Sequence, residues 1–235
     1  MKNNFCHLVV INLAILVSSN AQELPPGYIL QYSQDFSMKN SIADFNFSNP
    51  DSWKISREMN NFYLEISEDS GYIPPAISPK NLCILSKYMF GDFILELDFL
   101  MEAKEFSQSD VCIFFGLRDT LKYYYVSLSL KANVDNHKIL IVNNAPPDTI
   151  ATETNDRILP VNNKWNKAKI ERNIVTKTIT VYVNNMSNPV MEVKDKTLIM
   201  GYLGFGSFDG PCRLDNIKIY APTAIPEKSD IFTSY

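Results

Sequence analysis

The segment Asp110–Leu130, DVCIFFGLRDTLKYYYVSLSL, constrains the fold more than any other part of the chain. It contains two stretches rich in aromatic and β-branched residues, and a short polar turn separates them. Core-type and other side chains alternate along the second stretch, which is the period of a strand with two different faces. The segment therefore predicts a β-hairpin that contributes one face to a core.

Similar segments recur along the whole chain, with turn-forming residues between them. No segment shows the sustained apolar period of an amphipathic helix. The sequence predicts an all-β fold, a two-sheet antiparallel jelly-roll sandwich in a single domain. Strands are expected at Tyr28–Phe36, Phe62–Ser67, Leu82–Ser86, Asp92–Glu102, Asp110–Leu117, Lys122–Lys131, Lys138–Asn143, Trp165–Arg172, Thr176–Asn184, Pro189–Val193, Gly201–Phe208 and Cys212–Tyr220.

The two ends of the chain differ from its middle. Lys2 precedes a short apolar run, Leu8–Val17, and small residues follow, so residues 1–21 are predicted to be a signal peptide. The apolar run is too short for a membrane anchor, and no later segment approaches the roughly 20 continuous apolar residues of a membrane span. We expect residues 22–221 to form the sandwich, residues 222–235 to form a loose tail, and the protein to be periplasmic or secreted.

The charge of the chain argues against nucleic acid as a partner. Cleavage after residue 21 removes one of the 22 basic residues and leaves all 26 acidic ones, so the net charge becomes −5. Binding to phosphates needs a basic face.

Cysteine and histidine are too few for several common kinds of site. The mature chain keeps Cys83, Cys112 and Cys212 in or beside apolar segments, and they are either buried free thiols or one disulfide with one thiol left over. His137 is the single histidine after cleavage, so zinc sites that need several histidines or a cysteine cluster are excluded. Nucleophile elbows, phosphate loops and dinucleotide fingerprints are also missing.

Several segments carry a resemblance to a known superfamily. They are GDFILELDF, YYYV, WNKAKIERN with TITVYVN, GYLGFGSF and LDNIKIY. In this order they resemble the successive strands of a concanavalin A-like lectin/glucanase domain, over nearly the whole mature chain. Within the superfamily the chain is most similar to laminin-G-like bacterial domains and to the 3-keto-disaccharide hydrolase family. The resemblance implies two curved antiparallel sheets with ligands on the concave face or its rim, in an architecture that hosts lectins, glycosidases, lyases and adhesive modules.

The tyrosines of the segment Lys122–Lys131 are candidates for contact with a sugar. Strand alternation divides the segment into a core face and an exposed face. A tyrosine on the exposed face offers a flat ring for stacking on a sugar and a hydroxyl for hydrogen bonding. The alternative is that the tyrosines pack under a loop. The expected core face holds Val126, Leu128 and Leu130, and the expected exposed face holds Tyr123, Tyr125, Ser127 and Ser129.

Charged residues near the tyrosines indicate a possible chemistry. Arg118 can hold a carboxylate or sulfate of an acidic sugar by a bidentate contact, or it forms a surface salt bridge with Asp119 or Asp110. His137 opens the next predicted strand and is the candidate general base, with Tyr123 or Tyr125 as the acid. The alternative is an exposed histidine in a turn. The combination is similar to the one that jelly-roll polysaccharide lyases use.

Carboxylate pairs are the usual catalysts of glycosidases, which hold two of them about 5 to 9 Å apart. Glu96 and Asp98 resemble part of the Glu-x-Asp-x-Glu motif of laminarinase-like enzymes, but Leu100 replaces the second glutamate, so both are expected on a solvated face. Asp110 and Asp209 lie at strand edges and are better placed, although FDG at Asp209 also fits a simple turn. We assign Asp110 to catalysis and Asp209, Arg118 and Ser127 to substrate binding.

A structural calcium ion is the one cofactor that the resemblance implies. Members of the superfamily often tie the first and last strands together with calcium, and Asp35 and Asp215 match such ligands in their order along the chain. Carboxylate oxygens at loop ends suit this cation. The alternative for Asp215 is a turn cap through Asn216.

Two function hypotheses follow. The first is an exported enzyme that degrades a polysaccharide or oligosaccharide, either a glycoside hydrolase or a polysaccharide lyase. Its site would contain His137, Tyr123, Tyr125, Arg118 and Asp110. The second is a non-catalytic glycan-binding module that uses the same aromatic face.

Overall fold

The computed structural model describes most of the chain. The described residues are 23–38, 40–67, 70–75, 79–103, 110–132, 137–151, 153–155, 157–208 and 210–232. The predicted signal peptide and Asp209 lie outside these ranges, so the expectations about them stay predictions. Within the described ranges, no helix is long and apolar enough to cross a membrane.

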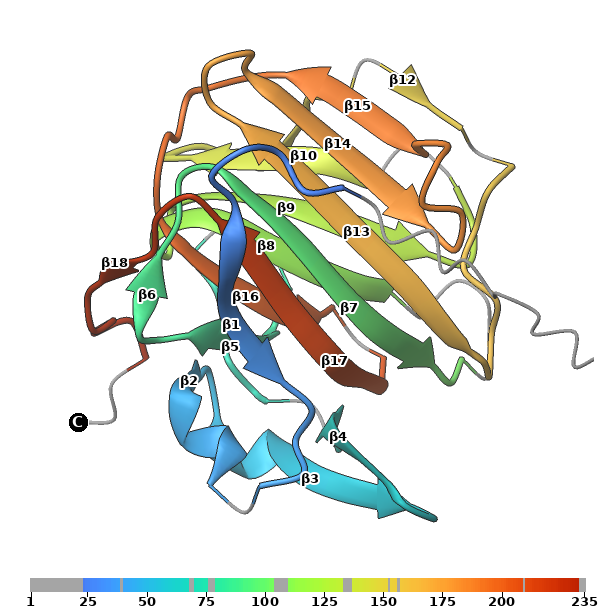
Figure 1. Cartoon of the computed structure of the whole chain (residues 1–235). Helices are drawn as coiled ribbons and strands as arrows, with labels where there is room; N and C mark the ends of the chain where they lie inside the picture. The colour runs from blue at the N-terminus through green and yellow to red at the C-terminus, as the bar shows by residue number, and fades with distance from the viewer. Residues whose placement is uncertain are drawn as a thin grey trace, which may run out of the picture.

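Two antiparallel sheets lie face to face (Figure 1). The front sheet has the strand order β12-β15-β14-β13-β7-β17-β4-β3, and β1 pairs with β17 as well. The back sheet has the order β11-β10-β9-β8-β16-β5-β2, and β18 pairs with β6. This architecture confirms the predicted all-β sandwich.

The bounds of the elements follow the chain in order. The front sheet contains β1 (Ile29–Gln34), β3 (Trp53–Glu58), β4 (Asn61–Ile66), β7 (Phe93–Met101), β12 (Glu153–Thr154), β13 (Trp165–Asn173), β14 (Thr178–Val183), β15 (Met191–Lys194) and β17 (Cys212–Ala221). The back sheet contains β2 (Phe45–Phe47), β5 (Asn81–Leu85), β8 (Asp110–Asp119), β9 (Lys122–Ser129), β10 (Lys138–Asn143), β11 (Asp148–Thr149) and β16 (Tyr202–Ser207). The small pair is β6 (Tyr88–Met89) with β18 (Ile225–Pro226), and two single-turn helices are η1 (Ser41–Asp44) and η2 (Pro50–Ser52).

The core between the sheets is built from alternate residues of each strand. In β7, Phe93, Leu95 and Leu97 are buried in it, whereas Glu96 and Asp98 lie on the outer face of the front sheet. Each large apolar side chain buried in this way stabilises the fold by about 1.5–3 kcal/mol. Glu96 and Asp98 therefore lie on a solvated face, as the sequence predicts.

The predicted central hairpin is present as β8 and β9. The two strands pair from Asp110 opposite Ser129 to Phe115 opposite Tyr124, and again at Asp119 opposite Lys122, with an irregular register between. Val126, Leu128 and Leu130 all belong to the core between the sheets, as predicted.

A second apolar layer covers the outer face of the back sheet, and the C-terminal segment is part of it. The backbone N–H of Ser229 donates to the carbonyl of Ser86 at 2.8 Å. The side-chain amide of Asn46 donates to the carbonyls of Ser229 and Ile231 at 3.0 and 3.1 Å. The C-terminal segment is therefore anchored from Ile225 to Phe232, and the expectation of a loose tail is wrong for these residues.

The three cysteines in the described part of the chain are free and buried. Cys83 and Cys212 lie in the core between the sheets, and Cys112 lies in the second apolar layer. Burial raises the pKa of all three thiols. Of the two interpretations that the sequence left open, the structure shows the buried free thiols.

Candidate functional site

The tyrosine row of β9 is buried, which corrects the expectation of an exposed face. Tyr123 and Tyr125 expose only 2% and 3% of their surface, and Ser127 and Ser129 are buried as well. Both tyrosine rings pack against Phe114, at centroid separations of 5.7 and 6.0 Å. The cause is the second apolar layer, because strand alternation defines two faces but does not reveal which of them another segment covers.

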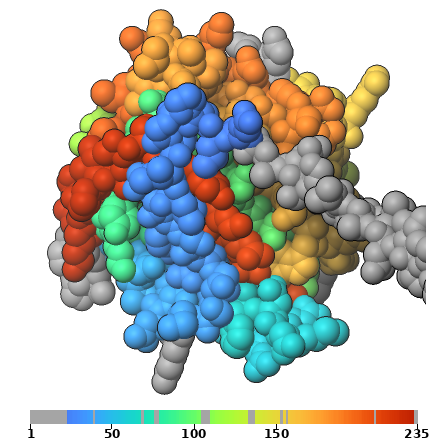
Figure 2. Space-filling view, viewed as in Figure 1, coloured from blue at the N-terminus to red at the C-terminus, as the bar shows by residue number. Residues whose placement is uncertain are grey.

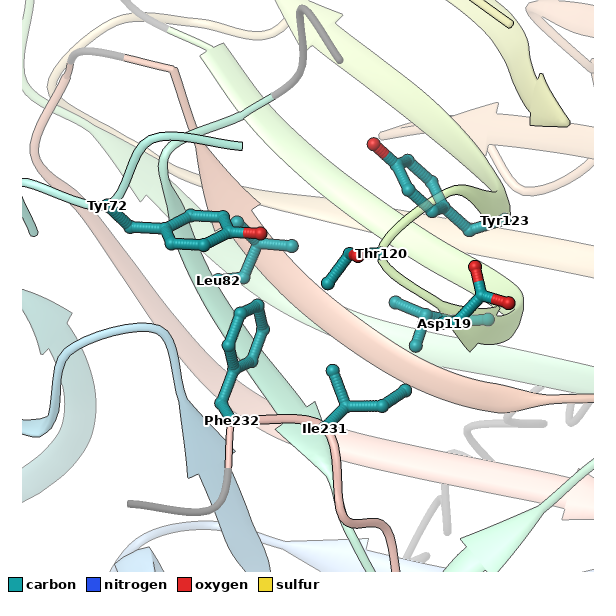
Figure 3. A pocket seen from close by; sticks show the side chains of 8 residues that line it. Tyr72, Leu82, Asp119, Thr120, Tyr123, Ile231 and Phe232 are labelled. Carbon is teal, nitrogen blue, oxygen red and sulfur yellow. The ribbon is translucent and has the colours of Figure 1, made fainter. Parts of the chain in front are cut away.

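Residues far apart in the sequence close this face (Figure 3). Tyr72 and Phe232 meet edge to face at a centroid separation of 5.1 Å. Together with Ile231, Leu82 and Tyr123 they border a space of about 10 Å³. Such a space has room for about one water molecule. The tyrosines thus pack beneath other segments, and a sugar cannot enter between them in this conformation.

Asp110 makes structural contacts at the start of β8. Its carboxylate accepts a hydrogen bond from the backbone N–H of Phe208 at 3.0 Å and one from the thiol of Cys112 at 3.2 Å. The residue is only 6% exposed. These contacts join β8 to the end of β16. The carboxylate that the sequence assigned to catalysis is therefore engaged in structural hydrogen bonds.

The register of the back sheet separates the residues predicted for acid–base chemistry. Lys138, which follows His137, pairs with Ser127, whereas Tyr123 pairs with Val142 at the other end of β10. At about 3.3 Å per residue, the backbones of His137 and Tyr123 are roughly 16 Å apart along the strands. The side chain of His137 is also fully buried. His137 and Tyr123 therefore do not meet at one reacting centre.

Arg118 lies at the other end of the hairpin from His137. Its side chain is exposed, and Nη1 lies 3.3 Å from the sulfur of Met89. Asp119 forms its ion pair with Lys122 at 3.6 Å. A substrate-binding role for Arg118 stays a prediction. Arg118 does not share a cleft with His137.

Asp35 and Asp215 come close together because β1 pairs with β17. Asp215 is buried and accepts a hydrogen bond from the backbone N–H of Asn216 at 2.6 Å. Burial raises the pKa of Asp215, and the charges of Asp98 and Asp35 act in the same direction. The oxygen donors suit calcium, but the described residues contain no group of three His, Cys, Asp or Glu side chains arranged to hold a metal ion.

A groove on the outer face of the front sheet is open to solvent. It lies between the β3–β4 hairpin and the start of β13 and has a volume of about 690 Å³. In Figure 2 the hairpin is cyan and lies beside the yellow-orange start of β13. Trp165 exposes 38% of its surface here, and Met59 exposes 89%. The groove, called the Trp165 groove below, is lined by Glu58, Met59, Asn60, Asn61, Leu100, Asn163, Lys164 and Trp165.

The hairpin side of the Trp165 groove is held by Arg57. Its Nε donates to the carbonyl of Met59 at 2.7 Å, and Nη2 donates to the side-chain oxygen of Asn60 at 3.2 Å. Met59 has a left-handed backbone, with a φ of 52°. The two turn residues are thus fixed beside the groove, and Asn60 presents a side-chain amide there.

The opposite side is held by asparagine side chains. Asn166 accepts from the N–H of Val161 at 2.8 Å and donates to the carbonyls of Val161 and Lys164 at 2.9 and 2.7 Å. Asn162 exchanges two 3.0 Å hydrogen bonds with the backbone of Ala103. These bonds fix the loop that carries Asn163, Lys164 and Trp165, so this wall of the groove is preorganised.

The indole of Trp165 rests on a supporting network. Tyr63 contacts it edge to face at a centroid separation of 5.8 Å. The guanidinium of Arg213 lies 4.9 Å from the Tyr63 ring centroid and forms ion pairs with Glu102 at 2.8 Å and Glu58 at 3.4 Å. A ring that packs against an aromatic neighbour and is partly exposed offers a surface for stacking.

The sequence matches no family model and no curated protein. Solved structures share its fold at low identity. The carbohydrate-binding module CBM66 from Bacillus subtilis aligns with a TM-score of 0.55 and 15% identity, over 76% of this chain and 96% of the module. Peanut lectin, solved with a 9mer peptide, aligns with a TM-score of 0.51 and 12% identity, over 84% of this chain and 98% of the lectin. The fold is a lectin-like β-sandwich. The GH43 protein BlXynB from Bacillus licheniformis aligns with a TM-score of 0.56 and 13% identity, over 81% of this chain but 39% of that protein.

In this lectin-like sandwich the Trp165 groove combines the groups that a sugar needs. The indole offers an apolar face, and the amides of Asn60 and Asn163 offer donors and acceptors, whereas the side chain of Asn61 hydrogen-bonds to Asp215. Glu58 is the one carboxylate among the described lining residues, and it pairs with Arg213. Most glycosidases use two carboxyl groups, and the described lining supplies one of them.

The sequence prediction missed this groove, although it contained a signal. The pair Asn60-Asn61 spans the end of the β3–β4 turn and the first residue of β4, and the pair Asn162-Asn163 occurs in a turn just before Trp165. The sequence identified WNKAKIER as a strand but did not bring it together with a hairpin about a hundred residues earlier. That juxtaposition depends on the order of the strands in the front sheet.

Proposed function

We propose that this protein is a glycan-binding module whose site is the Trp165 groove. The observation that carries the proposal is the partly exposed indole of Trp165, which packs against Tyr63 and lines a groove together with three asparagines. Aromatic rings with nearby amides bind sugars by stacking on the ring face and by hydrogen bonding to the hydroxyls. CBM66 is described as a carbohydrate-binding module, which agrees with this proposal.

Binding without turnover is the version that the geometry supports best. The described residues of the Trp165 groove supply one carboxylate, the histidine and tyrosines predicted for a lyase are buried, and the register places Tyr123 at the opposite end of β10 from His137. The finer resemblance to 3-keto-disaccharide hydrolases stays a prediction. A hydrolase or lyase would reveal itself by new reducing ends or new unsaturated ends in the glycan.

The substitution Trp165→Ala tests the proposal. Purified protein is titrated against a panel of soluble polysaccharides by affinity electrophoresis and calorimetry, with a reducing-end assay in parallel. We expect the affinity of the variant to fall at least about tenfold, because a tryptophan anchor at a binding site contributes roughly 2 kcal/mol or more. No new reducing ends should form.

Val175→Ala is the matched control, because Val175 is an apolar residue that is 84% exposed in the turn between β13 and β14. It should bind as the wild type does. If Trp165→Ala also binds as the wild type while its circular dichroism is unchanged, the proposed site is wrong.

Two further expectations accompany the proposal. Residues 1–21 would direct export, so the N-terminus of the protein recovered from periplasm or medium should be Gln22. A calcium ion would be held by Asp35 and Asp215 and would join β1 to β17.

A further inference from the structure

A second hollow lies on the same outer face of the front sheet. It has a volume of about 200 Å³, and its polar lining consists of Glu96, Asp98, Lys167, Asn216 and Lys218. It is called the Lys167 hollow below. None of these residues lines the Trp165 groove.

The register of β7 and β13 makes the two hollows neighbours. Trp165 pairs with Leu100, and two residues further along the strands Lys167 pairs with Asp98. Side chains two residues apart share a face of a strand and lie about 6.6 Å apart. The Trp165 groove and the Lys167 hollow therefore follow each other along one pair of strands.

The Trp165 groove and the Lys167 hollow together form a track along β7 and β13, and positive and negative charges are balanced in its lining. Its lining contains the carboxylates of Glu58, Glu96 and Asp98 and the ammonium groups of Lys164, Lys167 and Lys218. Lys167 pairs with Asp98 at 2.8 Å, and Asn216 donates to the other oxygen of Asp98 at 2.9 Å. The lining thus carries no net charge.

The track ends at a lysine that is withdrawn from solvent. Lys169 pairs with Glu96 in the register, but its side chain is 1% exposed. Its ammonium group lies 2.7 Å from a carboxylate oxygen of Glu171 and 3.9 Å from the ring centroid of Tyr182. Lys169 therefore adds no positive charge that a ligand can reach.

We infer that the ligand is a chain of uncharged sugars that runs along β7 and β13, with one sugar on Trp165 and a further one in the Lys167 hollow. This inference rests on the proposed function. A sugar hydroxyl both donates and accepts hydrogen bonds, so it can use carboxylates and ammonium groups that are already paired. Because the lining holds as many ammonium groups as carboxylates, it gives a uronic acid no net attraction, and the net charge of the whole chain, −4, repels polyanions.

The first experiment compares uncharged and acidic glycans. Soluble β-glucan, arabinan and fructan are set against polygalacturonate and alginate at low and high salt. We expect binding to one or more of the uncharged glycans, with an affinity that changes less than about twofold with salt, because screening acts on charged ligands. Preferred binding of a polyuronate that weakens with salt would overturn the inference and leave the proposed function standing. Absence of binding to every glycan would overturn both.

The second experiment measures chain length. Lys167→Met should lower the affinity for a bound oligosaccharide about threefold to tenfold by removing a hydrogen bond from the Lys167 hollow. The same variant should bind the corresponding monosaccharide as the wild type does, because one sugar on Trp165 does not reach Lys167. Lys196→Met, an exposed lysine in the loop after β15, is the control and should have no effect. Equal effects of Lys167→Met on both lengths, or none on either, would overturn the two-hollow track.

Discussion

Single residues show that the aromatic side chains of this chain have two different roles. Tyr123 and Tyr125 are buried against Phe114 and belong to the second apolar layer. Trp165 is partly exposed and borders an open groove. The residue type is therefore informative about sugar binding only when exposure is known.

The burial of Tyr125 predicts the effects of two substitutions. Tyr125→Ala should lower the free energy of unfolding by about 3 kcal/mol, because the truncation leaves a cavity beside Phe114. Tyr125→Phe keeps the ring and should bind glycans within about twofold of the wild type. Urea denaturation and glycan titration measure the two effects. A loss of glycan affinity in Tyr125→Phe with unchanged stability would return the site to the tyrosine row.

At the scale of strands, the sequence predicts the local alternation of side chains but not the contacts between distant segments. Strand alternation located the central hairpin and assigned Val126, Leu128 and Leu130 to the core, because the two-residue period is a local property. It could not predict the burial of the opposite face, which depends on the distant residues Tyr72 and Phe232. The Trp165 groove was missed for the same reason, since two distant segments form it.

The pairing of β1 with β17 gives the second prediction. If Asp35 and Asp215 hold calcium, the melting temperature should rise with added calcium and fall with a chelator, because an ion that binds the folded state stabilises it by about 2.7 kcal/mol at a hundred times its Kd. Asp215→Asn should remove this response, whereas Asp148→Asn, on the exposed strand β11, should retain it. Differential scanning fluorimetry measures the shift. Identical melting in calcium and chelator would exclude the ion.

In the whole molecule, the outer faces of the two sheets differ in how far they are covered. The outer face of the back sheet is closed by a second apolar layer that includes the C-terminal segment. The outer face of the front sheet carries the Trp165 groove and the Lys167 hollow. A lectin-like sandwich with one closed and one open face would bind its ligand on the open face, and we propose that the ligand contacts Trp165 there.

Acrylamide quenching of tryptophan fluorescence tests that claim most directly. The chain has two tryptophans: Trp53 is 4% exposed and Trp165 is 38% exposed, so quenching in the wild type reports mainly on Trp165. Addition of a glycan that calorimetry shows to bind should reduce the quenching, because a sugar stacked on the indole excludes acrylamide. Unchanged quenching at saturating glycan would contradict the account and place the site elsewhere on the molecule.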